Sequence, residues 1–451
     1  MTQLPADMAN DLDLLSDLVA KAKQAGAEAA DAVLFESASL AVSYRLGARE
    51  DLERSESKDL GLRIFLGQRQ AIVSSTDISP DSLKELIQRG LAMAAAMPDD
   101  PYCGLADSDR LCKDIPDLDL YDDEEPTPET LYEMAAEAEA AALAVAGVSN
   151  SESAGASWGS NRIALATSNG FSGGYATSSH SLFASVIAGE GTGMERDYDF
   201  TSAHHAADLA EAPAIGTAAG ERAVRRLKPR KVESQQLPVI FDPRVSHSML
   251  GHFTGAINGV SVARGTSFLK DCLGKRVFAD GIYIVDNPHR PRGLASKPFD
   301  GEGVANREWL LVDNGELATW IMDSASARQL GLATTGHASR GTSGPPSPGT
   351  TNLFMQPGAT SRDDLLAGVA TGLYVSELIG FGVNGVTGDY SRGASGFWIE
   401  NGVLTHPVSE LTIAGNLKDM FLNMTPADDL TFRHGSNAPT LRIDGLMVAG
   451  T

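Results

Sequence analysis

VSNSESAGASWGSNRIALATSNGFSGGYATSSHSLFASVIA, residues 148–188, is the stretch that does most to identify the fold class. Apolar and small polar residues fill 148–167 and roughly 174–188, as they do in β-strands. Between them, Asn169-Gly170 predicts a hairpin turn of type I′, because both central residues of that turn need φ > 0. The sequence therefore predicts two long antiparallel strands near the middle of the first half of the chain.

Outward from this hairpin, the first half of the chain alternates helices and strands. Further strands are predicted over 31–46 and 61–74. Helical spacing of apolar residues, with Ser-Pro and Thr-Pro starts, predicts four helices: 8–25, 80–97, 128–147 and 210–227. The order helix, strands, helix occurs twice, at 8–97 and 128–227, which is the pattern of a degenerate duplication. The acidic residues 98–126 between the two copies predict a solvated connector.

From Leu237 onward the chain consists of short apolar runs separated by Gly, Asn and Pro. Leu237–Phe241 predicts a buried strand, 244–258 a helix, and 361–379 an inserted helix. Asn314-Gly315 and Asn401-Gly402 predict two more hairpin turns. Further strands are predicted at Ile282–Val285, Trp309–Val312, Leu317–Met322, Phe397–Glu400, Leu411–Ala414 and Leu441–Ile443. The predicted fold class is α+β, with an N-terminal α/β domain of strands and helices (1–230) before a mostly antiparallel β domain with inserted helices (231–451).

Composition restricts the class of protein. The chain has 451 residues with 36 Lys+Arg against 59 Asp+Glu, a net charge of −23. Such a charge argues against binding to nucleic acid, which needs a basic face, and against docking to anionic membranes. Neither a run of about 18 apolar residues nor a signal peptide is visible. Three cysteines (Cys103, Cys112 and Cys272) are too few for a disulfide framework. These features predict a cytoplasmic protein with reduced thiols.

Three local patterns have structural explanations. Gly155–Gly159 matches G-x-S-x-G, but strand-like sequence follows it, whereas a nucleophile elbow requires a helix there. Gly380–Gly385 matches G-x-G-x-x-G, but a dinucleotide site requires a helix after the last glycine. The basic residues Arg225, Arg226 and Lys228 follow a predicted helix, so we interpret them as complementing its dipole at a domain boundary.

One pair of histidines lies on the predicted helix 244–258. His247 and His252 are five residues apart, so their rings point about 140° apart on an ideal helix. That spacing is less suited to chelation than the usual four-residue interval. From the residues alone, two unrelated histidines and a distorted metal site both remain open.

Four segments resemble the TldD/PmbA (TldE) peptidase family, and two of them are close to its PmbA/TldE branch. The first two are DLGLRIF (59–65) and HSMLGHFTGAINGVSVARGTSF (247–268). The PmbA-like segments are GLYVSELIGFGVNGVTGDYSRGASG (372–396) and ELTIAGNLKDM (410–420). Because the similarity extends over most of the chain, the chain is identified as a member of this family.

The resemblance implies a metal site that this chain has lost in part. In the TldD partner, H-E-x-x-x-H supplies two zinc-binding histidines, and a cysteine from the C-terminal domain completes the site. His247 and His252 match the two histidines, but Ser248 stands at the Glu position and no cysteine follows Cys272. Serine has no carboxylate to act as general base, a role that contributes about 10²–10⁴-fold to rate. We therefore expect no catalytic residue, a vestigial histidine pair and no zinc on this chain, with zinc on the TldD-type partner.

The family implies a function for such a chain. We expect a heterodimer with a TldD-type protein that encloses a cavity and degrades or processes unfolded peptides. For the chain without its partner, a homodimer and other oligomeric states remain open. In the family such substrates include an antibiotic-peptide precursor and an antitoxin. Two alternatives are a self-sufficient homodimeric metallopeptidase that uses His247 and His252, and a non-enzymatic peptide-binding modulator.

Two loops are candidates for lining the expected cavity. They are residues 336–352, which are too rich in Gly, Pro and Ser for regular structure, and residues 384–396. Within the second loop, Tyr390 and Arg392 are the residues expected to lie near substrate, where they would contact peptide carbonyls or a carboxylate. The alternative is that both residues stabilise a glycine-rich turn.

Overall fold

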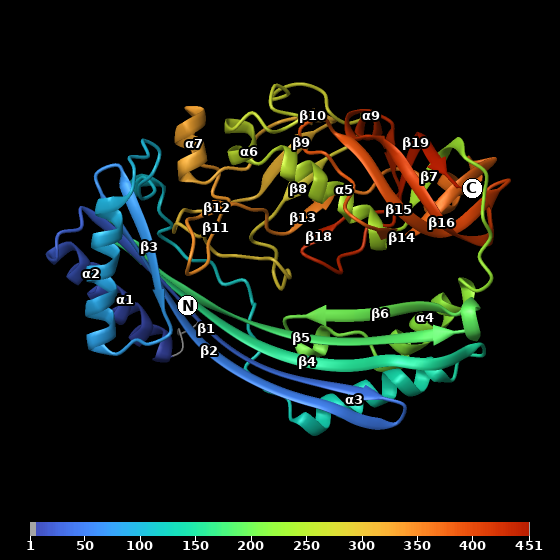
Figure 1. Ribbon diagram of the computed structural model, residues 1–451, viewed down its shortest axis with the longest axis horizontal. Coiled ribbons are helices and arrows are strands. Elements are labelled where there is room, and N and C mark those ends of the chain that lie inside the picture. The colour runs from blue at the N-terminus through green and yellow to red at the C-terminus, as the bar shows by residue number, and fades with distance from the viewer. Residues whose placement is uncertain (1–5, 451) are drawn as a thin grey trace.

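The structure is a computed structural model that describes residues 6–450, and it has two layers facing each other (Figure 1). The lower layer in that view is a six-stranded antiparallel sheet in the order β3-β2-β1-β4-β5-β6. Its strands are β1 (Ala29–Arg45), β2 (Ala48–Leu66), β3 (Arg69–Ser75), β4 (Val148–Thr167), β5 (Ser172–Ala188) and β6 (Glu195–Ala203). The predicted β4–β5 hairpin is confirmed.

Two pairs of helices cover one face of this sheet. They are α1 (Ala6–Gln24) with α2 (Pro80–Ala96), and α3 (Pro128–Leu143) with α4 (Ala212–Arg225). Even-numbered residues of β1 pack under both pairs, Ala32 and Leu34 under the first and Leu40 and Val42 under the second. Because side chains alternate along a strand, the odd-numbered residues face the other half of the chain. Val33 accordingly packs with Phe299, far along the chain.

The second half of the chain is built around a barrel-like sheet. Its order is β16-β15-β14-β7-β19-β17, and an additional β16–β19 pairing closes the ring. Its strands are β7 (Gln235–Phe241), β14 (Thr371–Ile379), β15 (Asp389–Glu400), β16 (Val403–Asn416), β17 (Met424–Pro426) and β19 (Leu441–Ala449). Strand β7 runs parallel to β14 and antiparallel to β19. The predicted α+β class is confirmed.

A smaller sheet, with the order β10-β9-β8-β13-β18, and a set of short helices complete this half. The strands are β8 (Ile284–Asp286), β9 (Trp309–Asp313), β10 (Glu316–Leu317), β11 (Ala338–Ser339), β12 (Ser347–Pro348), β13 (Leu353–Met355) and β18 (Ser436–Asn437). The helices are α5 (Pro243–Ala256), α6 (Gly259–Ala263), α7 (Ser324–Leu330), α8 (Arg362–Ala367) and α9 (Leu417–Leu422). A single large core lies between them, and α5 contributes Met249, Leu250 and Phe253 to it.

Three local predictions were wrong. The predicted helix 361–379 is only α8, and its second part is strand β14, because Leu373–Val375 pair with β7 in the buried sheet. The strand predicted to begin at residue 61 begins instead at Ala48, as strand β2. The first residues of β2 are exposed and polar, and they form a strand because β1 pairs with the whole length of β2. Of the predicted strand Leu317–Met322, only Leu317 belongs to a strand, the two-residue β10.

The turns of the predicted hairpins differ in detail. At Asn169-Gly170 only the glycine has positive φ, so the predicted type I′ turn is wrong, and the Thr167 hydroxyl group accepts the Phe171 N–H instead. Asn314-Gly315 and Asn401-Gly402 do have two positive φ angles each. Leu46-Gly47 also has two, at a turn that the sequence did not single out.

The two layers are held together by segments predicted to be loops. The connector 98–126 is not simply solvated, because Leu118 and Leu120 are buried and the Leu118 carbonyl accepts the Arg292 N–H. Loop 336–352 lies against the first sheet, so closely that a Cβ on Gly61 would lie 2.5 Å from the Thr342 carbonyl oxygen. Within residues 6–450, no helix is both long and apolar enough to cross a membrane.

Candidate functional site

Helix α5 carries the histidine pair at the junction of the two layers. Asp242 caps its start by accepting the Arg244 N–H, and Pro243 occupies the first turn, where its missing N–H costs nothing. Because the helix buries Met249, Leu250 and Phe253 in the core, the half-buried His247 and Ser248 face away from it. The helix thus presents the family motif toward the edge of the first sheet.

The two histidines have different neighbours, as their five-residue spacing predicts. The His247 ring lies 4.9 Å from the His434 ring, and His434 lies 5.3 Å from Phe200 on β6. His252 instead lies edge-on to Tyr390, with 5.8 Å between the ring centroids. The structure therefore does not bring the two imidazoles together as a pair.

All three of these histidines favour the neutral form. Burial lowers the pKa of His247. Burial, with the nearby positive charge of Arg392, lowers the pKa of His252 to about 4. Burial, with His247 and Arg433, lowers the pKa of His434 to about 4. Ser248 donates its hydroxyl hydrogen to the Val245 carbonyl oxygen at 2.6 Å, so it is already used within the helix.

A cavity of about 330 Å³ lies beside His247 and Ser248. It is lined by residues from β6, α4, α5, β14 and β15: Arg196, Asp197, Tyr198, Arg226, Arg244, Val245, His247, Ser248, Ser376, Glu377, Leu378 and Arg392. Four of these side chains are arginines and two are carboxylates, which leaves a surplus of two positive charges. The lining is thus cationic in a chain whose net charge is −23.

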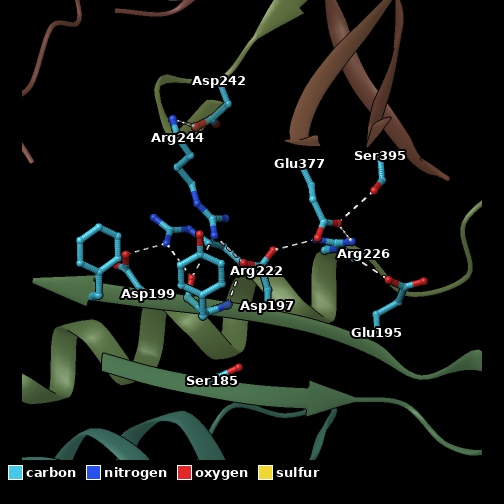
Figure 2. Close-up of polar contacts among 12 residues, drawn as sticks. Ser185, Glu195, Asp197, Asp199, Arg222, Arg226, Asp242, Arg244, Glu377 and Ser395 are labelled. Carbon is cyan, nitrogen blue, oxygen red and sulfur yellow. Dashed lines mark hydrogen bonds and ion pairs between the residues drawn. The ribbon is translucent and has the colours of Figure 1, made fainter. Parts of the chain in front are cut away.

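Three of the four arginines are held by carboxylates. Figure 2 shows Arg226 at the end of α4 reaching Glu377 on β14, across the junction between the layers. Arg244 Nη2 lies 2.8 Å from Asp197 Oδ1, and Arg196 Nη1 lies 3.1 Å from Glu152 Oε1. Burial opposes the charge of Arg226, but Glu377 and Asp197 outweigh it and raise its pKa.

Arg392 differs from the other three. Within the described part of the chain it makes no ion pair, and its Nε atom is buried without a hydrogen-bond partner. The Tyr390 hydroxyl oxygen and His252 Nε2 are also buried without partners, and Tyr390 is only 1% exposed. Phe381, whose side chain is 99% exposed, lies beside the Arg392 guanidinium group at 5.9 Å.

The residues at this site do not fit a zinc ion. In residues 6–450 no group of three or more His, Cys, Asp or Glu side chains is placed to hold a metal. Zinc in proteins takes three or four such ligands, whereas here the two imidazoles have separate surroundings. The guanidinium group of Arg392 lies near enough to depress the pKa of His252, and it would repel a divalent cation.

Of the residues predicted from the sequence, the structure gathers His247, Ser248 and Arg392 around one cavity and Tyr390 and His252 beside it. Residues 389–396 of the predicted loop 384–396 are part of strand β15, and Arg392 on it lines this cavity. Segment 336–352 contains the short strands β11 and β12, packs against the first sheet and does not line this cavity. Sequence reasoning missed Arg244, Glu377 and His434, which have no motif. Arg226 was noticed only as part of a basic helix end.

Comparisons with known proteins agree with these features. Three family models match: PmbA/TldA metallopeptidase domain 1 over residues 30–94, the central domain over 121–227 and the C-terminal domain over 234–450. Metalloprotease PmbA of Escherichia coli O157:H7 is 39% identical over 96% of this chain and 94% of its own length.

Solved structures show the same fold. A protein of Bacteroides thetaiotaomicron has a TM-score of 0.90 at 28% identity, covering 98% of this chain and 99% of that one. TldE of Thermococcus kodakarensis has a TM-score of 0.85 at 18% identity, covering 97% of this chain and all of that one.

Proposed function

The chain belongs to the PmbA/TldD metallopeptidase family, and from this membership we propose that it is the PmbA/TldE-type subunit of a two-chain cytoplasmic peptidase. In this proposal a TldD-type partner holds the zinc ion and hydrolyses the peptide bond. The present chain binds and positions unfolded peptides that the partner cleaves.

The observation that carries the proposal is Ser248 between the two histidines. A metallopeptidase needs a base to take a proton from the attacking water, and a serine hydroxyl group is not basic near neutral pH. Here that hydroxyl group donates to the Val245 carbonyl. The separate surroundings of His247 and His252 further support a partner-dependent enzyme over a self-sufficient homodimer.

An open strand edge supports the role in peptide binding. Strand β7 pairs with β14 only at Leu373–Val375, and in the described chain no strand pairs with the same edge of β14 over 376–379. Ser376 and Leu378 of this edge line the cavity. A peptide added there would be held by main-chain hydrogen bonds, which suit substrates of many sequences.

The test is co-purification followed by metal analysis and an activity assay. A tagged copy of this chain should pull down a TldD-type protein from its own cell extract, and the complex should contain zinc and degrade casein. The chain purified alone should contain well under one zinc per molecule and leave casein intact. Hydrolysis by the lone chain, or no complex and no activity after mixing with a TldD-type chain, would show that the proposal is wrong.

A further inference from the structure

Three neighbouring residues, one of which lines the junction cavity, each have a buried polar atom without a partner. These atoms are the Tyr390 hydroxyl oxygen, Arg392 Nε and His252 Nε2. Rings of His252 and Tyr390 are in contact, and the Arg392 charge acts on both residues. Buried polar groups are nearly always hydrogen-bonded, so each orphan calls for an explanation. Two of the three carry hydrogens to donate, which indicates a missing acceptor.

The charge of the cavity indicates what kind of acceptor is missing. Arg226 and Arg244 have carboxylate partners, but Arg392 has none among residues 6–450. An arginine beside a half-enclosed cavity, with neutral His247 near it, attracts an anion. The planar guanidinium group matches the two oxygens of a carboxylate, with which it forms paired, charge-assisted hydrogen bonds.

The position of Arg392 relates it to the open strand edge. Gly393 pairs with Ile379, so Arg392 lies beside the end of β14, and its side chain lines the cavity together with Ser376 and Leu378. A peptide lying along this edge would bring a carboxylate within reach of Arg392. The exposed Phe381 ring beside the guanidinium group would cover the bound segment from the solvent side.

We propose that Arg392, assisted by the Tyr390 hydroxyl group and His252, anchors a peptide by one of its carboxylates in this cavity. The carboxylate is either the C-terminal one or that of an Asp or Glu side chain. This inference rests on the proposed function, because it assigns the substrate chemistry of the same cavity. It gives this chain its own preference for peptides that present a carboxylate, separate from the zinc chemistry of a partner.

The experiment measures binding of three fluorescent peptides to the isolated full chain by anisotropy. The peptides share one neutral sequence and end in a free carboxylate, in an amide, or in an amide with one internal Asp. We expect at least one of the two peptides that carry a carboxylate to bind at least about tenfold more tightly than the plain amide, as gain of a charge-assisted hydrogen bond implies. The Asp-containing amide shows whether a side-chain carboxylate can substitute. Equal binding of all three peptides would overturn the proposal without any variant being needed.

Variants then identify the anchor. Arg392→Gln should bind all three peptides equally weakly, and Arg392→Lys should recover only part of the preference, because an ammonium group lacks the two-pronged geometry. Arg69→Gln, which makes the same change of charge on the first sheet, should leave the preference intact. Circular dichroism checks that each variant is folded. If Arg392→Gln keeps the wild-type preference for a carboxylate, Arg392 is not the anchor. Formation and activity of the complex with a TldD-type chain test the proposed function separately.

Discussion

Ser248 and Arg392 are two side chains that bear on whether this chain can hold a working zinc site. By the resemblance to the TldD motif, Ser248 stands where a glutamate would take a proton from water, and its hydroxyl group donates a hydrogen bond to the Val245 carbonyl oxygen of its own helix. Arg392 adds a positive charge beside the histidines, where a metal site would need anionic or neutral ligands. The two differences act independently, one on catalysis and the other on cation binding.

Restoring the carboxylate at position 248 should therefore not restore a metallopeptidase. We expect Ser248→Glu, purified alone, to contain well under one zinc per molecule and to leave casein uncleaved, because a third ligand is missing and Arg392 remains. Metal content by mass spectrometry and release of soluble peptides are the measurements. Stoichiometric zinc with hydrolysis that His252→Ala removes would contradict this prediction.

The neutral histidines make stability depend on pH. Because the folded chain lowers the pKa of His252 and His434 from 6.5 to about 4, the unfolded chain binds more protons between those values. The contribution of these two histidines to the free energy of unfolding should therefore be fully present above about pH 6.5 and should be lost as the pH drops toward 4. Urea unfolding at several pH values measures it. For the variant His434→Gln, the free energy of unfolding should fall less steeply with decreasing pH than for the wild type. An equal dependence on pH would contradict the lowered pKa of His434.

At the scale of elements, the sequence predicts helices that have strong local signals. It does not predict strands that form only because they pair with strands far along the chain. Thr127 accepts the Thr130 N–H at the start of α3, as its Thr-Pro start predicted. By contrast, residues 371–379 have apolar residues compatible with a helix, and only pairing with β7 and β15 makes them a strand. The same limit applies to the site. The motif identified His247 and Ser248, but Glu377 reaches the cavity, and His434 reaches the His247 ring, through tertiary folding alone.

Two glycines of α4, Gly216 and Gly220, lie against α3, and Gly216 makes the closer approach. A Cβ on Gly216 would lie 1.9 Å from the Ala138 carbonyl oxygen, a backbone atom that cannot move without shifting α3. We expect Gly216→Ala to lower the free energy of unfolding by about 1–3 kcal/mol, the usual cost of overpacking. Thermal and urea unfolding measure this.

A matched control lies in α5, where nothing lies within 4 Å of a Cβ on Gly251. Gly251→Ala should stabilise the chain by about 0.5–1 kcal/mol through the conformational freedom that glycine loses on folding. Equal effects of the two variants would contradict the packing argument.

At the scale of the whole molecule, a buried ion cluster joins the layers. Asp31 on β1 accepts from Arg63 Nε on β2 at 2.9 Å, and Arg340 Nη1 from loop 336–352 lies 2.6 Å from its other oxygen. Burial opposes the charge of Asp31, but Arg340 and Arg63 outweigh it and lower its pKa. Segment 336–352 thus attaches the two halves of the chain to each other.

Removing the shared carboxylate should loosen this attachment. Asp31→Asn removes the carboxylate with which buried Arg63 and Arg340 both form ion pairs, so we expect a loss of about 3 kcal/mol of unfolding free energy. Asp17→Asn breaks an exposed pair with Lys21 on α1 and should cost at most about 0.5 kcal/mol. Urea unfolding measures the free energy of unfolding of both variants. Losses of the same size would show that the buried ion cluster contributes little to stability.

The position of β7 has a consequence for how the chain is made. The first sheet is complete once residue 203 has left the ribosome, so it can fold while synthesis continues. Strand β7, in contrast, lies between β14 and β19, and the latter is contributed only by residues 441–449. Leu237–Phe241 therefore have no strand partner until β14 (Thr371–Ile379) is made, and one edge of β7 stays unpaired until residues 441–449 follow. During that interval the nascent chain is most exposed to aggregation and to chaperones.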